Sequence, residues 1–343
     1  MSKKAQLLKR QAHKGHVSII GAGPAGLIAA LHIKKNAPST KVTVIDREIF
    51  VGGILNQCIH PGFGLLEFGQ ELTGPEYAAK VSALCRDFEI EFLTETSVLS
   101  INKKLEVVAL SPKYGAKKFQ SKAIVLCTGC RERSRGALHI PGDRPSGIMT
   151  AGLAQKFINI DGLVPGSRVA ILGSGDIGAI MARRLTLQGV EVAAVIEIKK
   201  SLSARPRNVI QCIVDFQIPI YLEHTITKIV GRERLEKIKV AKILSDGRAD
   251  FSTEFEISCD TLLLSVGLIP ENELAEMAGV ALDAKSNGVI VDEKFMSSIP
   301  GIFACGNAMK IYDLVDHLSE DSKKAGESVA AYLTAPLVEG KQV

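Results

Sequence analysis

Two short glycine-rich stretches of this 343-residue chain have the residue types and the spacing that hold the pyrophosphate of a dinucleotide. In such a turn the glycines permit a tight bend, let backbone N–H groups approach the phosphates, and let the following helix pack closely on the preceding strand. Proline suits the first turn of that helix, where its missing N–H costs nothing. We expect one dinucleotide at Gly21, Gly23, Pro24, Ala25 and Gly26, and a second at Gly173, Gly175, Asp176, Ile177 and Gly178.

An acidic residue follows each turn at a similar distance. Asp46 lies 20 residues past Gly26, and Glu197 lies 19 residues past Gly178. A carboxylate at this place can accept hydrogen bonds from ribose hydroxyls, and it repels a 2′-phosphate. Glu197 therefore favours NAD(H) over NADP(H) as the second dinucleotide. NADP(H) stays an alternative because four basic residues could clamp a phosphate: Lys199, Lys200, Arg205 and Arg207.

The residues around both turns predict the elements that position them. The first turn lies between an apolar run at 17–20 and a helical run that opens at Pro24, and a β-branched run at 42–45 ends at Asp46. The second turn has the matching pieces at 168–172, 179–188 and 191–196. Because chance would have to meet the same requirements twice, this duplication is the strongest signal in the sequence.

The order of the elements predicts an α/β protein with two Rossmann-like domains. A segment rich in Pro and Gly at 139–147 is typical of a crossing between domains, and a strand-like run at 299–307 would return the chain to the first domain. We therefore predict a discontinuous first domain, 1–148 and 271–343, with 149–270 inserted as the second. Strands are expected at 90–93, 97–101, 106–110, 123–129, 220–224, 237–244 and 259–267, and helices at 73–88 and 313–333.

Composition argues against several classes of function. The net charge of +5, the aromatic content of 5% and the lack of Trp give no sign of nucleic-acid binding. No apolar run reaches the length of a transmembrane helix, and residues 1–16 contain no apolar core of a secretory signal. We therefore predict a cytoplasmic protein with no integral membrane segment. The basic leader at 1–16 is interpreted as a solvated terminus, in preference to a contact with an acidic partner or a membrane surface.

The seven cysteines are scattered through apolar runs, which is typical of reduced, buried thiols. Cys58 follows Gly52-Gly53 in a loop typical of ligand binding, so it is a candidate redox thiol, although a buried structural thiol is favoured. His60 is a candidate proton donor, with a hydrogen-bonded loop histidine as the favoured interpretation. Cys127 and Cys130 have C-x-x-C spacing but no second ligand pair, so we predict no metal site.

Together these motifs resemble the two-dinucleotide-binding flavoproteins of the pyridine nucleotide–disulfide oxidoreductase superfamily, over nearly the whole chain. Beyond the two turns, the resemblance rests on the segments Cys127-Thr-Gly129, Pro141-Gly142, Ser265-Val-Gly267 and Ile302-Phe-Ala-Cys-Gly-Asn307. It implies that FAD binds the first domain and that a nicotinamide nucleotide binds the inserted one. The additional contacts that it implies are Asp46, Arg47, Gly53, Thr128, Gly129, Gly306 and Asn307 for FAD, and Gly267 for NAD.

Several departures from the superfamily pattern bear on the reaction. The loop at 52–58 offers only one cysteine, where a dithiol reductase needs two beside the flavin. Ile180 stands where the reductases have a glutamate, and Asn307 where the family usually has Asp toward the ribityl chain. Too little chain follows Asn307 for the reductases' C-terminal dimerisation domain. Disulfide reduction is therefore disfavoured.

Longer stretches, such as the one at 52–65, look like a bacterial group of NAD(P)/FAD-dependent oxidoreductases associated with glycerol-3-phosphate dehydrogenase. This resemblance implies a partner flavoprotein that oxidises the substrate and a small cysteine-containing companion. Alpha subunits of proline, opine and sarcosine dehydrogenases share a segment similar to the one at 127–133.

The function predicted from this resemblance is an FAD-dependent NAD(H) oxidoreductase. It would move a hydride between nicotinamide and flavin, and electrons to or from a partner glycerol-3-phosphate dehydrogenase. The alternatives are a stand-alone thiol/disulfide reductase or NADH oxidase that uses Cys58, a subunit of a proline, opine or sarcosine dehydrogenase, and a non-catalytic flavoprotein scaffold.

Overall fold

The computed structural model describes residues 11–12 and 15–335, which divide into two compact units. Unit 1 contains the described residues up to Arg131 and from Ile269 onward, and unit 2 is Glu132–Leu268. Unit 2 begins well before residue 149, where sequence placed the start of the second domain. The reason is that residues 141–143 hydrogen-bond to Ile229 of unit 2, through Pro141 O and the Asp143 N–H.

Unit 1 is built on a five-stranded parallel sheet in the order β21-β10-β2-β3-β6. Its strands are β2 (His16–Ile20), β3 (Lys41–Ile45), β6 (Glu91–Leu93), β10 (Ala123–Leu126) and β21 (Ile302–Ala304). β2 pairs with β3 on one side and with β10 on the other, so the strand order reverses at β2. In open α/β sheets, ligands bind beside the carboxyl ends of the strands at such a reversal.

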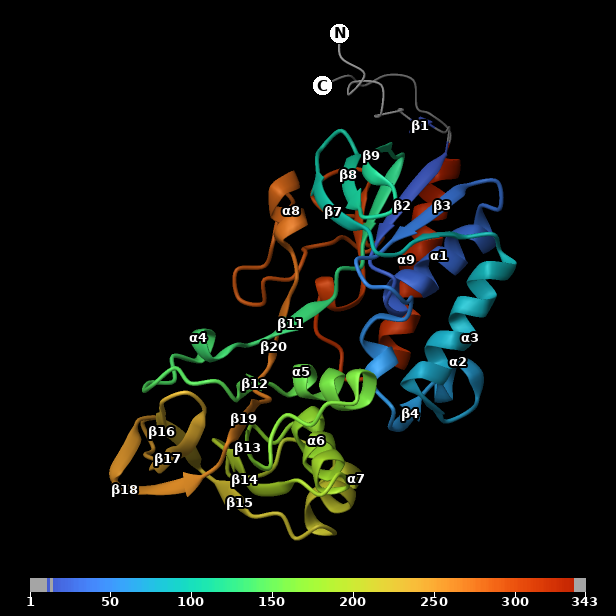
Figure 1. Ribbon diagram of the computed structural model, residues 1–343. Helices are drawn as coiled ribbons and strands as arrows, with labels where there is room; N and C mark the ends of the chain where they lie inside the picture. The colour runs from blue at the N-terminus through green and yellow to red at the C-terminus, as the bar shows by residue number, and fades with distance from the viewer. Residues whose placement is uncertain (1–10, 13–14, 336–343) are drawn as a thin grey trace. The chain divides into compact units, whose positions relative to one another are not determined.

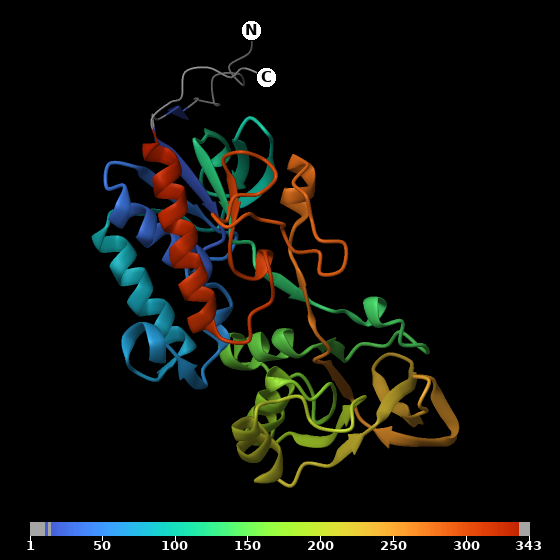
Figure 2. The same ribbon diagram turned by 180° about the vertical axis from the view of Figure 1, so that it is seen from behind.

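Three long helices of unit 1 lie side by side on one face of this sheet, as both views show: α1 (Pro24–Asn36), α3 (Gly74–Asp87) and α9 (Val315–Thr334) (Figures 1 and 2). α3 starts where sequence expected it because Thr73 and Glu76 form a capping box, in which each side chain bonds the other residue's backbone N–H. Short elements complete this part of the unit: η2 (Gly53–Gln57), β4 (Pro61–Phe63), α2 (Leu65–Phe68), β5 (Leu72–Thr73), α8 (Glu273–Ala278) and η5 (Gly306–Ala308).

A second sheet of unit 1 has four strands in the order β1-β9-β8-β7. They are β1 (Gln11–Ala12), β7 (Ser97–Ile101), β8 (Glu106–Ser111) and β9 (Gly115–Gln120). β7, β8 and β9 form an antiparallel meander, and β1 pairs with β9 in parallel. Alternation along the meander buries Ile101, Val107 and Phe119 in a core shared with the ends of the five-stranded sheet.

Unit 2 repeats the plan with a parallel sheet in the order β12-β19-β13-β14-β15. The strands are β12 (Ile148–Thr150), β13 (Arg168–Leu172), β14 (Glu191–Glu197), β15 (Ile220–Leu222) and β19 (Thr261–Leu264). The helical segments are α4 (Arg135–Leu138), α5 (Ala151–Lys156), η3 (Phe157–Asp161), α6 (Asp176–Thr186), α7 (Pro206–Val209) and η4 (Ile210–Val214). An antiparallel sheet follows, of β16 (His224–Gly231), β17 (Leu235–Ile243) and β18 (Ala249–Ser258). The predicted α/β class with two Rossmann-like domains is thereby confirmed.

The segments that connect the two units are β11 (Cys130–Glu132) and β20 (Leu268–Pro270), which pair with each other. The second element of the inserted repeat, α6, begins at Asp176 and ends at Thr186, slightly earlier than the 179–188 expected from sequence. α6 starts directly after Gly175, because the glycine turn leads straight into the helix. No helix within the described ranges is both long enough and apolar enough to cross a bilayer.

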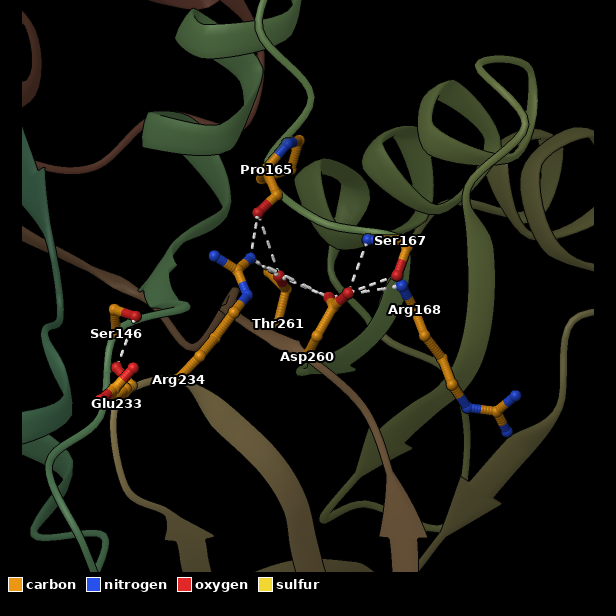
Figure 3. A network of polar contacts seen from close by, with 8 residues as sticks. All are labelled: Ser146, Pro165, Ser167, Arg168, Glu233, Arg234, Asp260 and Thr261. Atoms are coloured by element: carbon orange, nitrogen blue, oxygen red, sulfur yellow. Dashed lines mark hydrogen bonds and ion pairs between the residues drawn. The ribbon is translucent and has the colours of Figure 1, made fainter.

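A polar network fixes the amino ends of β13 and β19 in unit 2 (Figure 3). Asp260 accepts hydrogen bonds from the Ser167 N–H at 2.8 Å and from the Thr261 hydroxyl at 2.9 Å. Arg234 donates to Pro165 O at 2.5 Å and to the same hydroxyl at 2.9 Å. The network joins the β16–β17 turn to the parallel sheet at the end opposite to the glycine turn, so it braces the unit away from its ligand edge.

We predict that Gly326→Leu destabilises unit 1, because α9 packs closely against α1 at Gly326. A Cβ there would lie 2.6 Å from Ala29 O and 2.9 Å from the His32 Cβ. Overpacking of this kind costs roughly 1–3 kcal/mol of unfolding free energy, which urea denaturation would measure. Lys323→Leu, at an exposed position of the same helix, is the control and should change that free energy by less than about 0.5 kcal/mol. Equal losses of unfolding free energy in both variants would show that the close packing at Gly326 is not the cause.

Candidate dinucleotide-binding sites

The first glycine turn joins β2 to α1 at the carboxyl edge of the unit 1 sheet. Gly21 has a φ of +107°, and its N–H donates to Ile45 O at 2.8 Å. A Cβ on Gly21 would lie 2.2 Å from Cys127 O, and a Cβ on Gly26 would lie 2.0 Å from Gly21 O. Side chains are excluded at both positions because the backbones of turn, helix and β10 touch one another.

The second turn joins β13 to α6 in unit 2 and has the same construction. Gly173 has a φ of +97°, and its N–H donates to Ile196 O at 2.8 Å. A Cβ on Gly173 would lie 2.1 Å from Ser265 O, and a Cβ on Gly178 would lie 2.5 Å from Gly173 O. The two turns, which are similar in sequence, thus make equivalent contacts in the structure.

The middle glycines differ from the outer ones because they face open space. A Cβ on Gly23 or on Gly175 would meet no atom within 4 Å. Each is the N-cap of its helix with extended backbone and no side-chain cap, so the first helical N–H groups are left for another acceptor. An uncapped helix N-terminus with this clearance fits a pyrophosphate, since the N–H groups and the helix dipole both favour an anion.

The two acids hold these turns from the neighbouring strand. Asp46 Oδ2 accepts the Ala22 N–H at 2.6 Å, and its Oδ1 accepts the Glu48 N–H at 2.8 Å. Glu197 Oε2 accepts the Ser174 N–H at 3.0 Å in the matching position of the second turn. Asp46 is partly exposed with acceptor capacity left on both oxygens, as a ribose contact requires.

Glu197 is more deeply embedded, with 4% of its surface exposed. Its carboxylate also accepts bonds from the Ser174 hydroxyl, the Ser203 hydroxyl at 3.2 Å and the Lys199 N–H at 3.0 Å. Burial alone would raise the pKa of Glu197, but these hydrogen bonds outweigh it, and the net shift lowers the pKa. Glu197 is therefore a carboxylate at neutral pH. The sequence did not reveal Ser174 and Ser203 as its partners, although a hydroxyl residue between the first two glycines was a possible sign.

Several residues implied for the first site lie against its glycine turn. A Cβ on Gly53 would lie 2.9 Å from the Gly23 Cα, and Gly52 donates its N–H to Ala22 O at 2.8 Å. A Cβ on Gly306 would lie 2.5 Å from the Ala25 Cβ, so η5 packs directly on α1. The loops at 52–53 and 306 therefore enclose the turn from two sides.

Thr128 and Gly129 follow β10, next to the turn. The Thr128 hydroxyl is buried and has no hydrogen-bond partner among the described residues, which fits a polar ligand atom at this place. Gly129 has a φ of +76° and accepts the Glu271 N–H at 3.0 Å. Asn307 donates to Cys130 Sγ at 3.3 Å and accepts the Tyr312 N–H at 3.1 Å, whereas Arg47 is exposed to solvent.

The remaining residues expected at the second site lie in unit 2. Asp176 begins α6 and accepts the Arg205 N–H at 2.9 Å and the Asn208 amide at 2.8 Å, while Ile177 packs on the core. Gly267 has a φ of +103° and accepts the Arg133 N–H at 3.1 Å. The four basic residues that could clamp a phosphate are all exposed: Lys199, Lys200, Arg205 and Arg207.

The two candidate catalytic residues are Cys58 and His60, and the surroundings of Cys58 do not favour a redox role. Cys58 is 6% exposed, donates to Ile54 O at 3.3 Å, and has its pKa raised to about 12 by burial. A thiol with this pKa is protonated at neutral pH and is a poor nucleophile. His60 makes a 3.0 Å contact from Nδ1 to Pro61 O, and its buried Nε2 has no partner in the described part of the chain.

The C-x-x-C spacing does not bring Cys127 and Cys130 together. The Sγ of Cys127 lies 3.4 Å from the Sγ of Cys305, because β10 and β21 are neighbours in register, and Cys130 is the residue bonded by Asn307. The contact with Cys305, together with burial, raises the pKa of Cys127. Over residues 11–12 and 15–335, no group of three or more His, Cys, Asp or Glu side chains could hold a metal ion.

Comparison with known proteins places these two sites in a family. Residues 15–322 match the model of the family described as pyridine nucleotide-disulphide oxidoreductase. The ferredoxin reductase component of chlorobenzene dioxygenase from Cupriavidus sp. (strain PS12) is 26% identical over 302 residues, which cover 85% of this chain and 67% of that protein. An NADH oxidase from Methanocaldococcus jannaschii is 26% identical over 315 residues, which cover 87% of this chain and 64% of that protein.

Among solved structures, thioredoxin reductase from T. acidophilum superposes with a TM-score of 0.75 at 22% identity. The match covers 92% of this chain and 98% of that one, which shows a common fold. By contrast, this chain spans about two thirds of the length of the two relatives above.

We predict that a valine substitution at either middle glycine abolishes ligand binding at its own site and leaves the other site intact. Gly23→Val and Gly175→Val should fold normally, because both positions have open space and a negative φ. The added side chain would stand where the phosphates approach, so Gly23→Val should lose the flavin and Gly175→Val should lose nicotinamide binding. Absorbance of bound flavin and calorimetry with NADH measure the two losses, and each variant is the control for the other. Retention of both ligands by either variant would refute its site.

We also predict that Glu197→Gln destabilises the protein most at neutral pH. A lowered pKa in the folded state means that the ionised carboxylate stabilises the fold above the ordinary pKa of 4.5, and that this contribution is lost as pH falls below 4.5 toward the lowered pKa. The difference in unfolding free energy between wild type and variant should therefore shrink in acid. Urea denaturation over a pH series measures it. Glu233→Gln, at an exposed position of unit 2, is the control and should show no such trend.

Proposed function

This chain belongs to the pyridine nucleotide-disulphide oxidoreductase family, and we propose that it is an FAD-dependent NAD(P)H oxidoreductase that exchanges electrons with a separate partner protein in the cytoplasm. The observation that carries the proposal is the contact-by-contact duplication of the glycine turn and its acid. Two dinucleotide sites in one chain suit a reaction between two dinucleotides.

FAD is proposed to occupy the unit 1 site and the nicotinamide nucleotide the unit 2 site. In unit 1 the helix N-terminus at Gly23 would hold the pyrophosphate, Asp46 the adenosine ribose, and the unpartnered Thr128 hydroxyl a polar atom of the cofactor. In unit 2 the helix N-terminus at Gly175 would take the second pyrophosphate. Glu197 Oε1, which accepts one protein N–H, would accept a ribose hydroxyl as well.

When bound, FAD supplies hydride chemistry with nicotinamide and can release electrons singly or as a pair. The chain's own residues bind and orient: the turns fix the pyrophosphates, and the acids fix the riboses. No side-chain acid or base is needed for the hydride step itself. The main contribution of the protein would be to orient the two nucleotides and to keep them out of bulk water.

NAD(H) is proposed as the preferred nicotinamide cofactor. The negative charge of Glu197 would repel a 2′-phosphate, and that charge is secured by its hydrogen bonds. Against this, Lys199 and Lys200 are exposed beside it and could attract such a phosphate. The name of the NADH oxidase among the relatives supports NADH.

The finer proposal is that the partner is a glycerol-3-phosphate dehydrogenase with a small cysteine-containing companion. Support for it comes from the motif resemblance alone. The relative named as the ferredoxin reductase component of a dioxygenase supports the broader idea that such chains serve multi-component systems.

We predict that the purified chain is yellow and that its flavin absorbance bleaches in anaerobic titration with NADH. Bleaching should need less NADH than NADPH, since Glu197 disfavours the 2′-phosphate. A protein that holds FAD but is reduced by neither nucleotide would overturn the proposed reaction and favour a non-catalytic flavoprotein.

The thiol-based alternative is tested by Cys58→Ser. We expect turnover of NADH with an artificial electron acceptor to stay within roughly twofold of wild type, because hydride transfer between two cofactors needs no thiol. Cys85→Ser, at another buried thiol whose pKa is raised to about 12, controls for the cost of a buried hydroxyl. Loss of turnover in Cys58→Ser alone would replace the present proposal with the thiol reductase.

The partner is tested by reconstitution. Glycerol 3-phosphate, NAD⁺, a purified glycerol-3-phosphate dehydrogenase flavoprotein and its small cysteine-containing companion should form NADH only when this chain is added. If NADH-dependent bleaching is intact but the mixture forms no NADH, the oxidoreductase stands and this partner is wrong.

A further inference from the structure

The charge of this protein is unevenly distributed along its sequence. Residues 1–16 contain five Lys or Arg and no acid, and residues 97–122 contain six Lys and one Glu. Together they hold 11 of the 42 basic side chains but only one of the 37 acidic ones, so the rest of the chain has 31 basic and 36 acidic side chains. The two segments thus carry more than the whole positive excess of the molecule.

Short strands from these two distant segments pair with each other in unit 1. Residues 97–122 are the β7–β8–β9 meander, and β1 belongs to the basic leader. β1 pairs with β9, with Gln11 opposite Phe119 and Ala12 opposite Gln120. β1 is therefore the edge strand of the lysine-rich sheet.

Three of the six lysines meet at one end of the meander. Lys103 and Lys104 form the β7–β8 turn, and that turn is tied to the end of β9 by bonds from Gln120 to Lys104 O at 2.7 Å and from Ser121 to Leu105 O at 3.0 Å. Lys122 follows directly. All three lysines are exposed. The only acid of the segment, Glu106, is already paired with Lys118 at 2.7 Å.

This cluster, Lys103, Lys104 and Lys122, lies at the edge of unit 1 opposite to its dinucleotide site. The Lys122 N–H donates to His16 O at 2.8 Å, at the amino end of β2, whereas the glycine turn follows the carboxyl end of the same strand. Binding at the cluster would therefore leave the dinucleotide site of unit 1 uncovered.

We propose that the meander docks unit 1 on the surface of an anionic phospholipid bilayer. Clusters of Lys and Arg bind acidic lipid headgroups through many weak, additive attractions that need no shaped pocket. The cluster has lysines rather than arginines, with no fixed fork for a particular carboxylate, which fits a diffuse anionic surface better than one acidic protein. The meander also exposes Leu99 and Leu110, at 49% and 47%, which could enter the headgroup layer.

This inference goes beyond the proposed oxidoreductase and does not rest on it. The leader was interpreted above as a solvated terminus. Residues 1–10 and 13–14 of it lie outside the described residues, so the proposal rests on the meander alone.

The test is flotation of the full chain with phosphatidylcholine vesicles that contain or lack phosphatidylglycerol. The protein should float only with the anionic vesicles at low salt, and raising the salt should release it. The triple variant K103Q/K104Q/K122Q should reduce the partition coefficient by roughly fivefold for each lysine removed.

A matched variant, K228Q/K285Q/K294Q, removes three exposed lysines from the rest of the chain and should bind vesicles like wild type. Urea denaturation of both variants reports their folding without reference to catalysis. Lack of flotation with anionic vesicles at low salt, equal losses in the two variants, or capture by an acidic protein in place of vesicles would each overturn the proposal.

Discussion

The structure depends on one hydrogen bond that is made twice. An acid at the end of one strand accepts the N–H of the residue between the first two glycines of the neighbouring strand's turn, Asp46 from Ala22 and Glu197 from Ser174. This bond fixes the turn in a conformation where the middle glycine faces open space and the helix N-terminus stays uncapped. Without it the backbone N–H groups would have no defined direction, and an anion would bind them weakly.

Each acid therefore holds its glycine turn in addition to its proposed contact with a ribose, so its oxygens are less available to a ligand than the sequence suggests. Asp46 is partly exposed and keeps acceptor capacity, but Glu197 is nearly buried and spends most of its capacity on Ser174, Ser203 and the Lys199 N–H. A ribose at the second site would share a carboxylate that already holds the protein together. Removing that charge would weaken both the loop and its discrimination between phosphates.

Much of this could be predicted from sequence, and the rest could not for identifiable reasons. Glycine spacing and β-branched runs are local signals, so the two turns, their strands and α3 were found close to their true limits. β16 and β18 were missed because neither contains a run of more than two apolar residues. Gly142 was put outside unit 2 because its pairing with Ile229 is distant in sequence. The unpartnered Thr128 hydroxyl, the Cys127–Cys305 contact and the β1–β9 pairing are likewise made by neighbours far along the chain, which no local pattern records.

The route of the chain also sets an order in which the protein can be made. Unit 2 is one continuous segment, whereas the sheet of unit 1 needs β21, and α1 needs α9, both of which come last. During synthesis on the ribosome, the first half of unit 1 must wait with its apolar face uncovered while unit 2 emerges and folds. Chaperone binding to nascent chains should therefore centre on α1 and the edge of β10, and it should end once residues of α9 have left the exit tunnel.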